Sequence, residues 1–287
     1  MRYIEFQKVA STVESLCIKA AYELGADVLE ALEQAVEKES DPKAAEILKS
    51  IIENAKLAEA EKIPLCQDTG LAIVFVEQGA AVAVRAPAGR AKGTLVDAIN
   101  DGVAAGYDKG YLRKSVVAEP LNKRKNTGTN TPAIIHHSVV PGDKIRITVM
   151  AKGGGSENKS QFKMFRPTAD RKEIIDWVAD VVGKAGADAC PPFVVGVGIG
   201  GNFETSCLLA KKALRRKLGS ENGDEFYAKL EADLLERINA IGVGPQGMGG
   251  DTTTLACLVE TAGCHIASLP VAVNIECHSH RHKSIVL

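Results

Sequence analysis

The stretch CPPFVVGVGIGGNFETSCLLAKKALRRKL, residues 190–218, decides the fold class. Its apolar run, Phe193–Val197, is short and rich in valine, which is typical of a buried strand. A glycine turn follows, and Asn202 then opens a run with helical spacing that reaches Leu218. A strand that leads through a tight turn into a helix is a building block of α/β proteins.

Elements of the same two kinds flank this stretch. Upstream, apolar residues recur at helical spacing over 169–184. Downstream, a helix is expected over 224–241, closed by Gly242 after its last turn, and strands are expected over 255–259 and 271–275.

The N-terminal part of the chain begins with helices over residues 8–60. The clearest helix starts at Asp41-Pro42, a capping residue followed by proline in the first turn. Residues 109–132 are polar and are expected to form a long loop. The other expected elements are strands over 71–76 and 81–85, a helix over 94–105, and a hairpin of strands 133–140 and 144–151 around residues 141–143.

These elements predict a mixed α/β (α+β) fold, with a helical N-terminal segment followed by two α/β subdomains. We expect residues 1–287 to form one domain. A division into subdomains near residues 165–170 fits the pattern, although no Pro/Ser-rich linker marks it.

The composition excludes several functional classes. A net charge of −1 and 5% aromatic residues give no basis for binding nucleic acid or an anionic membrane. The N-terminus has no apolar signal segment, and no stretch approaches the roughly 20 apolar residues of a membrane span. We therefore expect a cytoplasmic protein, in which the seven cysteines are thiols or metal ligands rather than disulfides.

Two glycine loops match the dinucleotide-binding pattern G-x-G-x-x-G, at residues 196–201 and 242–247. A dinucleotide-binding unit also needs a second strand that ends in Asp or Glu about 20 residues further on, and none is expected there. A dinucleotide-binding module that uses the Gly196–Gly201 loop stays an alternative. Such loops also suit a small dicarboxylate, as does the lysine-flanked glycine run of residues 152–159.

The cysteines fall into two groups. Cys17, Cys207 and Cys257 have apolar neighbours, which is typical of small buried side chains. Three others lie in loops or at the ends of elements, beside Pro, Gly, Gln, Asp or His, and are candidate metal or cluster ligands: Cys66, Cys190 and Cys277. Their spacing matches no zinc motif. Cys264 adjoins His265, and the basic segment 278–283 is either a set of metal ligands or a solvated polar tail.

Six motifs together resemble the class I, iron–sulfur fumarate hydratases. The resemblance covers the chain from about residue 45. The motifs are CQDTG (66–70), NTGTN (126–130), KGGGSENK (152–159), CPP (190–192), GVGPQGMGG (242–250) and NIECHSHRH (274–282). The related L-tartrate dehydratases share the cysteines, and KGGGSENK favours the fumarate hydratases.

The resemblance implies a [4Fe–4S] cluster held by Cys66, Cys190 and Cys277 at a central site, with one open iron. That iron would bind the hydroxyl and one carboxylate of L-malate, and act as a Lewis acid for the poor leaving group hydroxide. Asp68 would be the acid/base residue. From the sequence alone, its structural role would be that of a turn residue that supports Gly70. The substrate carboxylates would be held by Gln67, Arg113, the backbone N–H of Gly155, and His265.

The resemblance also implies a partner. Single-chain members continue into a C-terminal domain beyond the point that corresponds to Leu287, so this chain resembles the α subunit of the two-subunit form. A separate β subunit would bring a threonine and several Arg and Lys residues to the substrate, in a dimer of αβ units. The alternative substrates are L-tartrate or another hydroxy-diacid.

Overall fold

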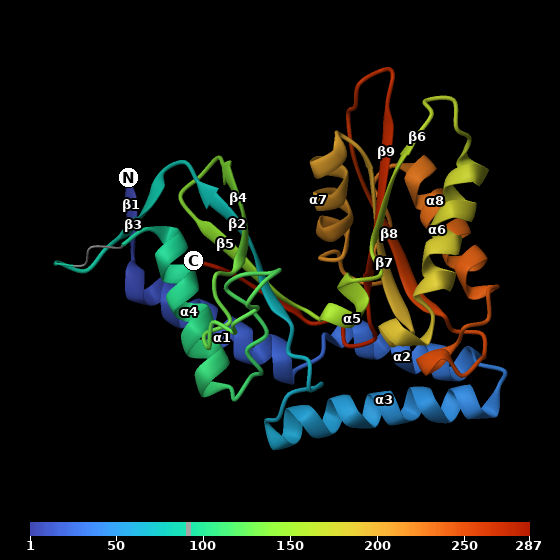
Figure 1. Cartoon of the computed structure of the whole chain (residues 1–287), viewed down its shortest axis with the longest axis horizontal. Helices are drawn as coiled ribbons and strands as arrows, with labels where there is room; N and C mark the ends of the chain where they lie inside the picture. The colour runs from blue at the N-terminus through green and yellow to red at the C-terminus, as the bar shows by residue number, and fades with distance from the viewer. Residues whose placement is uncertain (90–92) are drawn as a thin grey trace. The chain divides into compact units, whose positions relative to one another are not determined.

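The computed structural model describes residues 1–89 and 93–287, which form two compact units (Figure 1). Unit 1 comprises Met1–Gly25, Leu57–Gly153 and Arg281–Leu287, and unit 2 comprises Ala26–Lys56 and Gly154–His280. The chain leaves unit 1 at Gly153–Gly154, upstream of residues 165–170 where the sequence suggested a division, and returns to it at His280–Arg281. The mixed α/β class and the helical N-terminal segment are confirmed.

Unit 1 contains a four-stranded sheet of order β10-β5-β2-β4 and a small parallel pair, β1 and β3. β2 pairs parallel with β4 and antiparallel with β5, and β10 pairs antiparallel with β5. The elements are β1 (Arg2–Glu5), α1 (Phe6–Tyr22), β2 (Leu71–Gly79), β3 (Val82–Arg85), α4 (Leu95–Lys109), β4 (Ile134–Val140), β5 (Ile145–Lys152) and β10 (His282–Val286).

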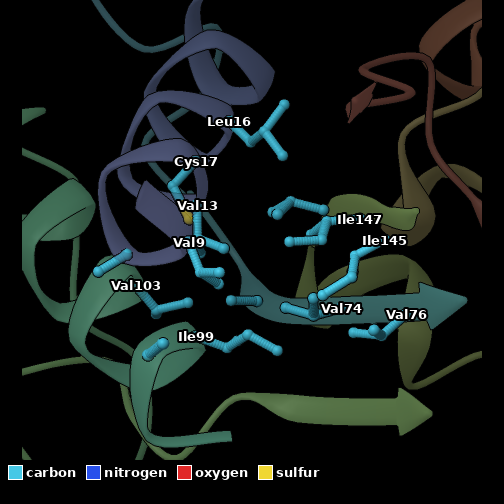
Figure 2. Close-up of a cluster of buried hydrophobic side chains, with 14 of the residues drawn as sticks. Val9, Val13, Leu16, Cys17, Val74, Val76, Ile99, Val103, Ile145 and Ile147 are labelled. Atoms are coloured by element: carbon cyan, nitrogen blue, oxygen red, sulfur yellow. The ribbon is translucent and has the colours of Figure 1, made fainter. Parts of the chain in front are cut away.

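The core of unit 1 lies between its two helices and the sheet. Figure 2 shows side chains of α1, α4, β2 and β5 that point toward one another in this core. Val9 and Val13 of α1 and Val74 of β2 are fully buried. Thr94 caps α4, since its hydroxyl accepts from Asp97 N while the Asp97 carboxylate accepts from Thr94 N.

The predicted hairpin of residues 133–151 is wrong. Both strands exist, as β4 and β5, but β2 lies between them in the sheet. The connection passes around the end of β2, where Gly79 N donates to Lys144 O at 2.8 Å. A Cβ on Gly79 would lie 2.4 Å from Gly142 O, so the close passage requires glycine there.

Unit 2 contains a four-stranded sheet of order β6-β9-β7-β8, in which β7 and β8 are parallel and β9 is antiparallel to both β6 and β7. Its elements are α2 (Ala26–Lys38), the first part of α3 (Pro42–Glu61), α5 (Gly154–Glu157), β6 (Gln161–Phe165), α6 (Arg171–Ala185), β7 (Phe193–Gly200), α7 (Phe203–Ala213), α8 (Glu225–Asn239), β8 (Thr254–Ala262), β9 (Leu269–Glu276) and two 3-10 turns, Ala187–Ala189 and Pro245–Gly247.

Helices cover both faces of the unit 2 sheet, with α7 on one face and α6 and α8 on the other (Figure 1). Every residue of β7 is buried for this reason. The Gly196–Gly201 loop has a packing role, because a Cβ on Gly196 would lie 2.1 Å from Ala210 O of α7. The same holds for Gly198, whose Cβ would lie 2.0 Å from Ser206 O. These glycines let a helix backbone approach the strand, and so account for the motif without a dinucleotide.

Most predicted elements are present at nearly the predicted positions, including α3, which begins at Pro42. The helix expected to reach Leu218 ends at Ala213. The strands β1, β6 and β10 were not predicted. Within residues 1–89 and 93–287, the longer helices are all too polar or too short to cross a bilayer.

Candidate active site

The loop Cys66–Gly70 lies in unit 1 between α3 and β2. Cys66 is half-buried, and its Sγ lies 3.9 Å from Oε1 of Gln67. Asp68 forms the expected turn, since its Oδ1 accepts from Gly70 N at 3.1 Å. Gly70 has a φ of +75°, and a Cβ there would lie 2.5 Å from Lys152 O. The loop therefore packs closely against the end of β5.

Two buried polar side chains form hydrogen bonds to the backbone carbonyls of this loop. The hydroxyl of Tyr107 lies 3.0 Å from Thr69 O and 3.1 Å from Gly70 O, and can donate to either. Burial raises the pKa of Tyr107, so it stays a neutral donor over the ordinary pH range. Nδ2 of Asn130 also donates to Gly70 O, at 3.2 Å. Neither residue was singled out from the sequence, although Asn130 ends the NTGTN motif.

Asn130 connects this loop to the polar segment that carries Arg113. The Asn130 side chain is fully buried, and its Oδ1 accepts from Ser115 N at 2.7 Å. Thr69 Oγ1 donates to the carbonyl of Arg113 at 2.9 Å. The backbone of Arg113 is thus fixed next to the Asp68 loop, while its side chain is exposed. The structure brings together Cys66, Gln67, Asp68 and Arg113 within unit 1.

The second group of site residues lies in unit 2, around Cys190. Cys190 is exposed and adopts a left-handed backbone conformation, with φ 57° and ψ 68°. The backbone N and Nε2 of Gln246 both donate to Pro191 O, each at 2.8 Å. Gln246 belongs to the second glycine loop, where a Cβ on Gly244 would lie 1.7 Å from Gly249 O. That loop therefore supports the cysteine loop in this structure.

Cys277 lies beside Cys190. It follows the last residue of β9, and the register of β7 and β9 pairs Val194 with Glu276. The next residue, His278, donates its backbone N–H to Cys190 O at 3.2 Å. Cys277 is half-buried. The backbone bond from His278 therefore brings two cysteine segments from distant parts of the sequence together at one end of the unit 2 sheet.

The KGGGSENK loop packs against both cysteine segments. Lys159 forms an ion pair of 3.0 Å with Asp188, which lies two residues before Cys190. Ser160 Oγ accepts from Ile275 N at 3.2 Å, and Oε2 of Glu157 accepts from Asn274 Nδ2 at 3.1 Å. Gly155 lies in the same short helix as Glu157, and a Cβ on it would lie 3.4 Å from Asp188 O. The structure thus brings Gly155 to Cys190 and Cys277.

His265 lies elsewhere in unit 2. It is exposed in the turn between β8 and β9, where its Nδ1 accepts from Ala267 N at 3.1 Å. This turn adjoins Gly200 and Ala262, which pair at the last residue of β7. Phe193, which follows the Cys190 loop, is the first residue of the same strand. At about 3.3 Å per residue, the length of β7 puts His265 roughly 20 Å or more from Cys190 of the same chain.

The other cysteines differ from the three candidates. Cys17 and Cys257 are buried, as predicted, and Cys207 is half-buried. Burial, with a smaller contribution from Glu14, raises the pKa of Cys17 to about 12. Burial raises the pKa of Cys257 as well. These thiols are poor ligands because a ligand must be the thiolate.

The polar segment after Cys277 is not a solvated tail. Ser279, His280 and Arg281 are at most 3% exposed, and the chain continues into β10. A group of three or more His, Cys, Asp or Glu side chains placed to hold a metal ion does not occur among residues 1–89 and 93–287. Cys190 and Cys277 form a pair in unit 2, and Cys66 belongs to unit 1.

Comparisons with known proteins agree on one family. A family model described as fumarate hydratase (Fumerase) matches residues 10–286. A similar protein from Methanocaldococcus jannaschii, named putative L(+)-tartrate dehydratase subunit alpha, is 42% identical over 278 residues, which cover 96% of this chain and 95% of the relative. A protein from Escherichia coli O157:H7, named L(+)-tartrate dehydratase subunit alpha, is 30% identical, over 91% of this chain and 84% of the relative.

Proposed function

Because the chain belongs to the fumarate hydratase (Fumerase) family, whose members are hydro-lyases, we propose that it is the α subunit of an enzyme that interconverts fumarate and L-malate. The observation that carries this proposal is the pairing of the Cys190 loop with the Cys277 segment, through the bond from His278 N to Cys190 O. The closeness of these two segments, with Gly155 near Asp188 O, supports the proposal that both cysteines serve one site.

The thiols fit an iron–sulfur cluster by their chemistry. Cys190 is exposed and Cys277 is half-buried, so both can bind as thiolates at a surface that a partner can cover. We propose that Cys66, Cys190 and Cys277 hold a [4Fe–4S] cluster, which uses one fewer thiolate than a fully ligated cluster. When bound, such a cluster supplies a Lewis acid for the departing hydroxide.

The chain's own residues would handle the proton and the carboxylates. Loss of water from L-malate breaks a C–H bond next to a carboxylate and a C–O bond on the neighbouring carbon. We propose that the Asp68 carboxylate takes the proton, and returns it in the hydration direction. The exposed side chain of Arg113, the amide of Gln67 and the N–H of Gly155 would bind the substrate carboxylates. His265 is not among the carboxylate-binding residues that we propose for the same α chain. It lies in the turn between β8 and β9, which adjoins the end of β7 far from Cys190.

The names of the two relatives support a partner subunit. Both are called α subunits, so we propose that a separate β subunit completes the site, in a dimer of αβ units. The same names favour a second candidate substrate, L-tartrate, whose dehydration gives the enol of oxaloacetate. The KGGGSENK loop supports fumarate as the first candidate.

A substrate panel tests this function. The α chain, reconstituted anaerobically with iron and sulfide and mixed with its β partner, is expected to convert L-malate and fumarate with at least about tenfold higher kcat/KM than L-tartrate. Such a ratio corresponds to about 1.4 kcal/mol of transition-state discrimination. Fumarate is measured by its ultraviolet absorbance, and oxaloacetate by coupled reduction. The reverse ratio would assign the enzyme to tartrate, and no turnover of any hydroxy-diacid would refute the hydro-lyase.

Asp68→Asn is expected to lower kcat by about 10²-fold, the usual scale for losing an acid/base group. The amide keeps the size of the side chain and an oxygen for the bond from Gly70 N, so the loop should stay in place. The visible absorbance of the cluster is expected to be unchanged. Asp108→Asn is the matched control, since Asp108 is a largely exposed unit 1 carboxylate paired with Lys114. A kcat near wild type in Asp68→Asn would remove Asp68 from the mechanism.

A further inference from the structure

Arg281 is a buried arginine at the start of the last segment of unit 1. Its side chain is only 2% exposed, although the sequence around it is polar. Nη1 donates to the backbone carbonyl of Asp68 at 2.7 Å. The contact joins two positions 213 residues apart in the sequence. Arg281 therefore reaches directly into the loop that carries the proposed acid/base residue.

The guanidinium also lies close to the Asp68 carboxylate. A Cβ placed on Gly153 would lie 3.4 Å from Nη2 of Arg281 and 3.4 Å from Oδ2 of Asp68. Both atoms therefore border the small space above Gly153. Both charges also act on the buried hydroxyl of Tyr107. Burial raises the pKa of this hydroxyl, the charge of Asp68 raises it further, and the charge of Arg281 lowers it. The guanidinium thus binds the backbone of Asp68 and shares the surroundings of Gly153 with its carboxylate.

Packing alone does not explain an arginine at this position. Taking a guanidinium out of water costs several kcal/mol unless its surroundings offset the loss. Within residues 1–89 and 93–287, Nε of Arg281 has no hydrogen-bond acceptor. An apolar side chain of similar length would avoid that loss, so the charge and the bond to Asp68 O point to a role at the loop.

We propose that Arg281 is a positioning residue for Asp68. This inference rests on the proposed function, in which Asp68 is the acid/base residue. Among the bonds that fix Asp68, Oδ1 accepts from Gly70 N, and the carbonyl accepts from Arg281. Gly70 is in turn held by Tyr107 and Asn130. With these bonds in place, Oδ2 is the carboxylate oxygen directed toward Gly153, and its orientation depends on the Asp68–Thr69 peptide that Arg281 holds.

The test compares Arg281→Met and Arg281→Lys in the reconstituted complex with the β partner. Arg281→Met is expected to lower kcat for L-malate by about 10²-fold, the effect of a small misplacement of a catalytic group. KM is expected to stay within about twofold, because an acid/base group acts in the transition state. Arg281→Lys keeps the charge and one donor, and is expected to recover about tenfold of the loss.

A second measurement does not depend on activity. In the α chain without a cluster, hydrogen exchange of a peptide spanning residues 66–70 is expected to become about tenfold faster in Arg281→Met, as local opening becomes easier. Exchange over α6 serves as the internal reference. Arg216→Met is the matched control, because Arg216 is a half-buried arginine of unit 2 bonded to Glu231. It is expected to lower Tm while leaving kcat of the folded complex and exchange of 66–70 unchanged.

The outcomes separate this inference from the proposed function. An Arg281→Lys or Arg281→Met complex with wild-type kcat would overturn the positioning role and leave the hydro-lyase intact. An increase in KM alone would also overturn it, since that would make Arg281 a binding group. If Arg281→Met does not fold, the kcat and exchange of Arg281→Lys decide. A wild-type complex that turns over no hydroxy-diacid would refute the function, whatever the exchange data show.

Discussion

Cys190→Ser is expected to leave the α chain with less than about one iron per polypeptide after anaerobic reconstitution, compared with about four in the wild type. Serine has nearly the same size, and the loop backbone is held by bonds that do not involve the side chain, from Cys190 N to Ala187 O and from His278 N to Cys190 O. The fold should therefore survive. A hydroxyl is a much poorer ligand for iron than a thiolate, so the loss should be specific to the cluster.

Turnover is expected to fall by about 10³-fold or more in the same variant. A Lewis acid lowers the barrier for a hydroxide leaving group by several kcal/mol, and each 1.36 kcal/mol corresponds to a factor of ten. Iron and sulfide analysis, visible absorbance and kcat of the complex measure the effect. Cys264→Ser is the control, because Cys264 is another exposed cysteine of unit 2 and its Sγ bonds only to Ser268 O among the described contacts. Wild-type iron and sulfide in Cys190→Ser, or zinc alone in reconstituted wild type, would refute the cluster assignment.

The α chain without its β partner is expected to bind the cluster but to show less than about 1% of the hydratase activity of the complex. Fumarate and L-malate carry two negative charges, and removal of a proton next to a carboxylate adds a third. Arg113 has an exposed positive side chain that can reach a substrate carboxylate, whereas the side chain of Arg281 is buried. Each missing donor at developing charge costs about 10²–10³ in kcat, so loss of a few donors makes turnover hard to detect.

Titration with the β subunit measures this requirement. Activity should rise with added partner to a plateau at equimolar ratio, while the iron content of the α chain stays constant. Heat-denatured β subunit is the matched control and should restore nothing. Full activity from purified α chain would contradict the proposal that the site needs both subunits.

Local elements of the fold were predictable because their signals are local. Asp41-Pro42 marked the start of α3, and the apolar runs marked β2, β7 and β9. The strand β6 was missed because it is a short, largely exposed edge strand of five residues, too short for its alternation to be a clear signal. The hairpin of β4 and β5 was wrong because insertion of β2 depends on pairing between distant segments. No pattern within residues 133–151 carries that information.

The candidate site shows the same limit. The motifs identified the residues, and local turn chemistry predicted how Asp68 supports Gly70. The roles of Tyr107, Asn130 and Arg281 could not be predicted, because each depends on a contact with a segment far away in the sequence. The buried position of Arg281 was unexpected since its neighbours are polar. His265 was implied by the family resemblance and lies in none of the quoted motifs, and the strand directions place it away from Cys190.

The late position of β10 in the chain has a consequence for biosynthesis. Unit 2 is complete once His280 has been made, whereas the sheet of unit 1 lacks its edge strand until residues 282–286 leave the ribosome. β5 must therefore wait for a partner that is synthesised more than a hundred residues later. During that interval its unpaired edge is open to wrong pairing, and the Asp68 loop lacks Arg281. Chains stalled before residue 282, compared with chains stalled on a linker added after residue 287, should therefore show unit 1 acquiring protease resistance last.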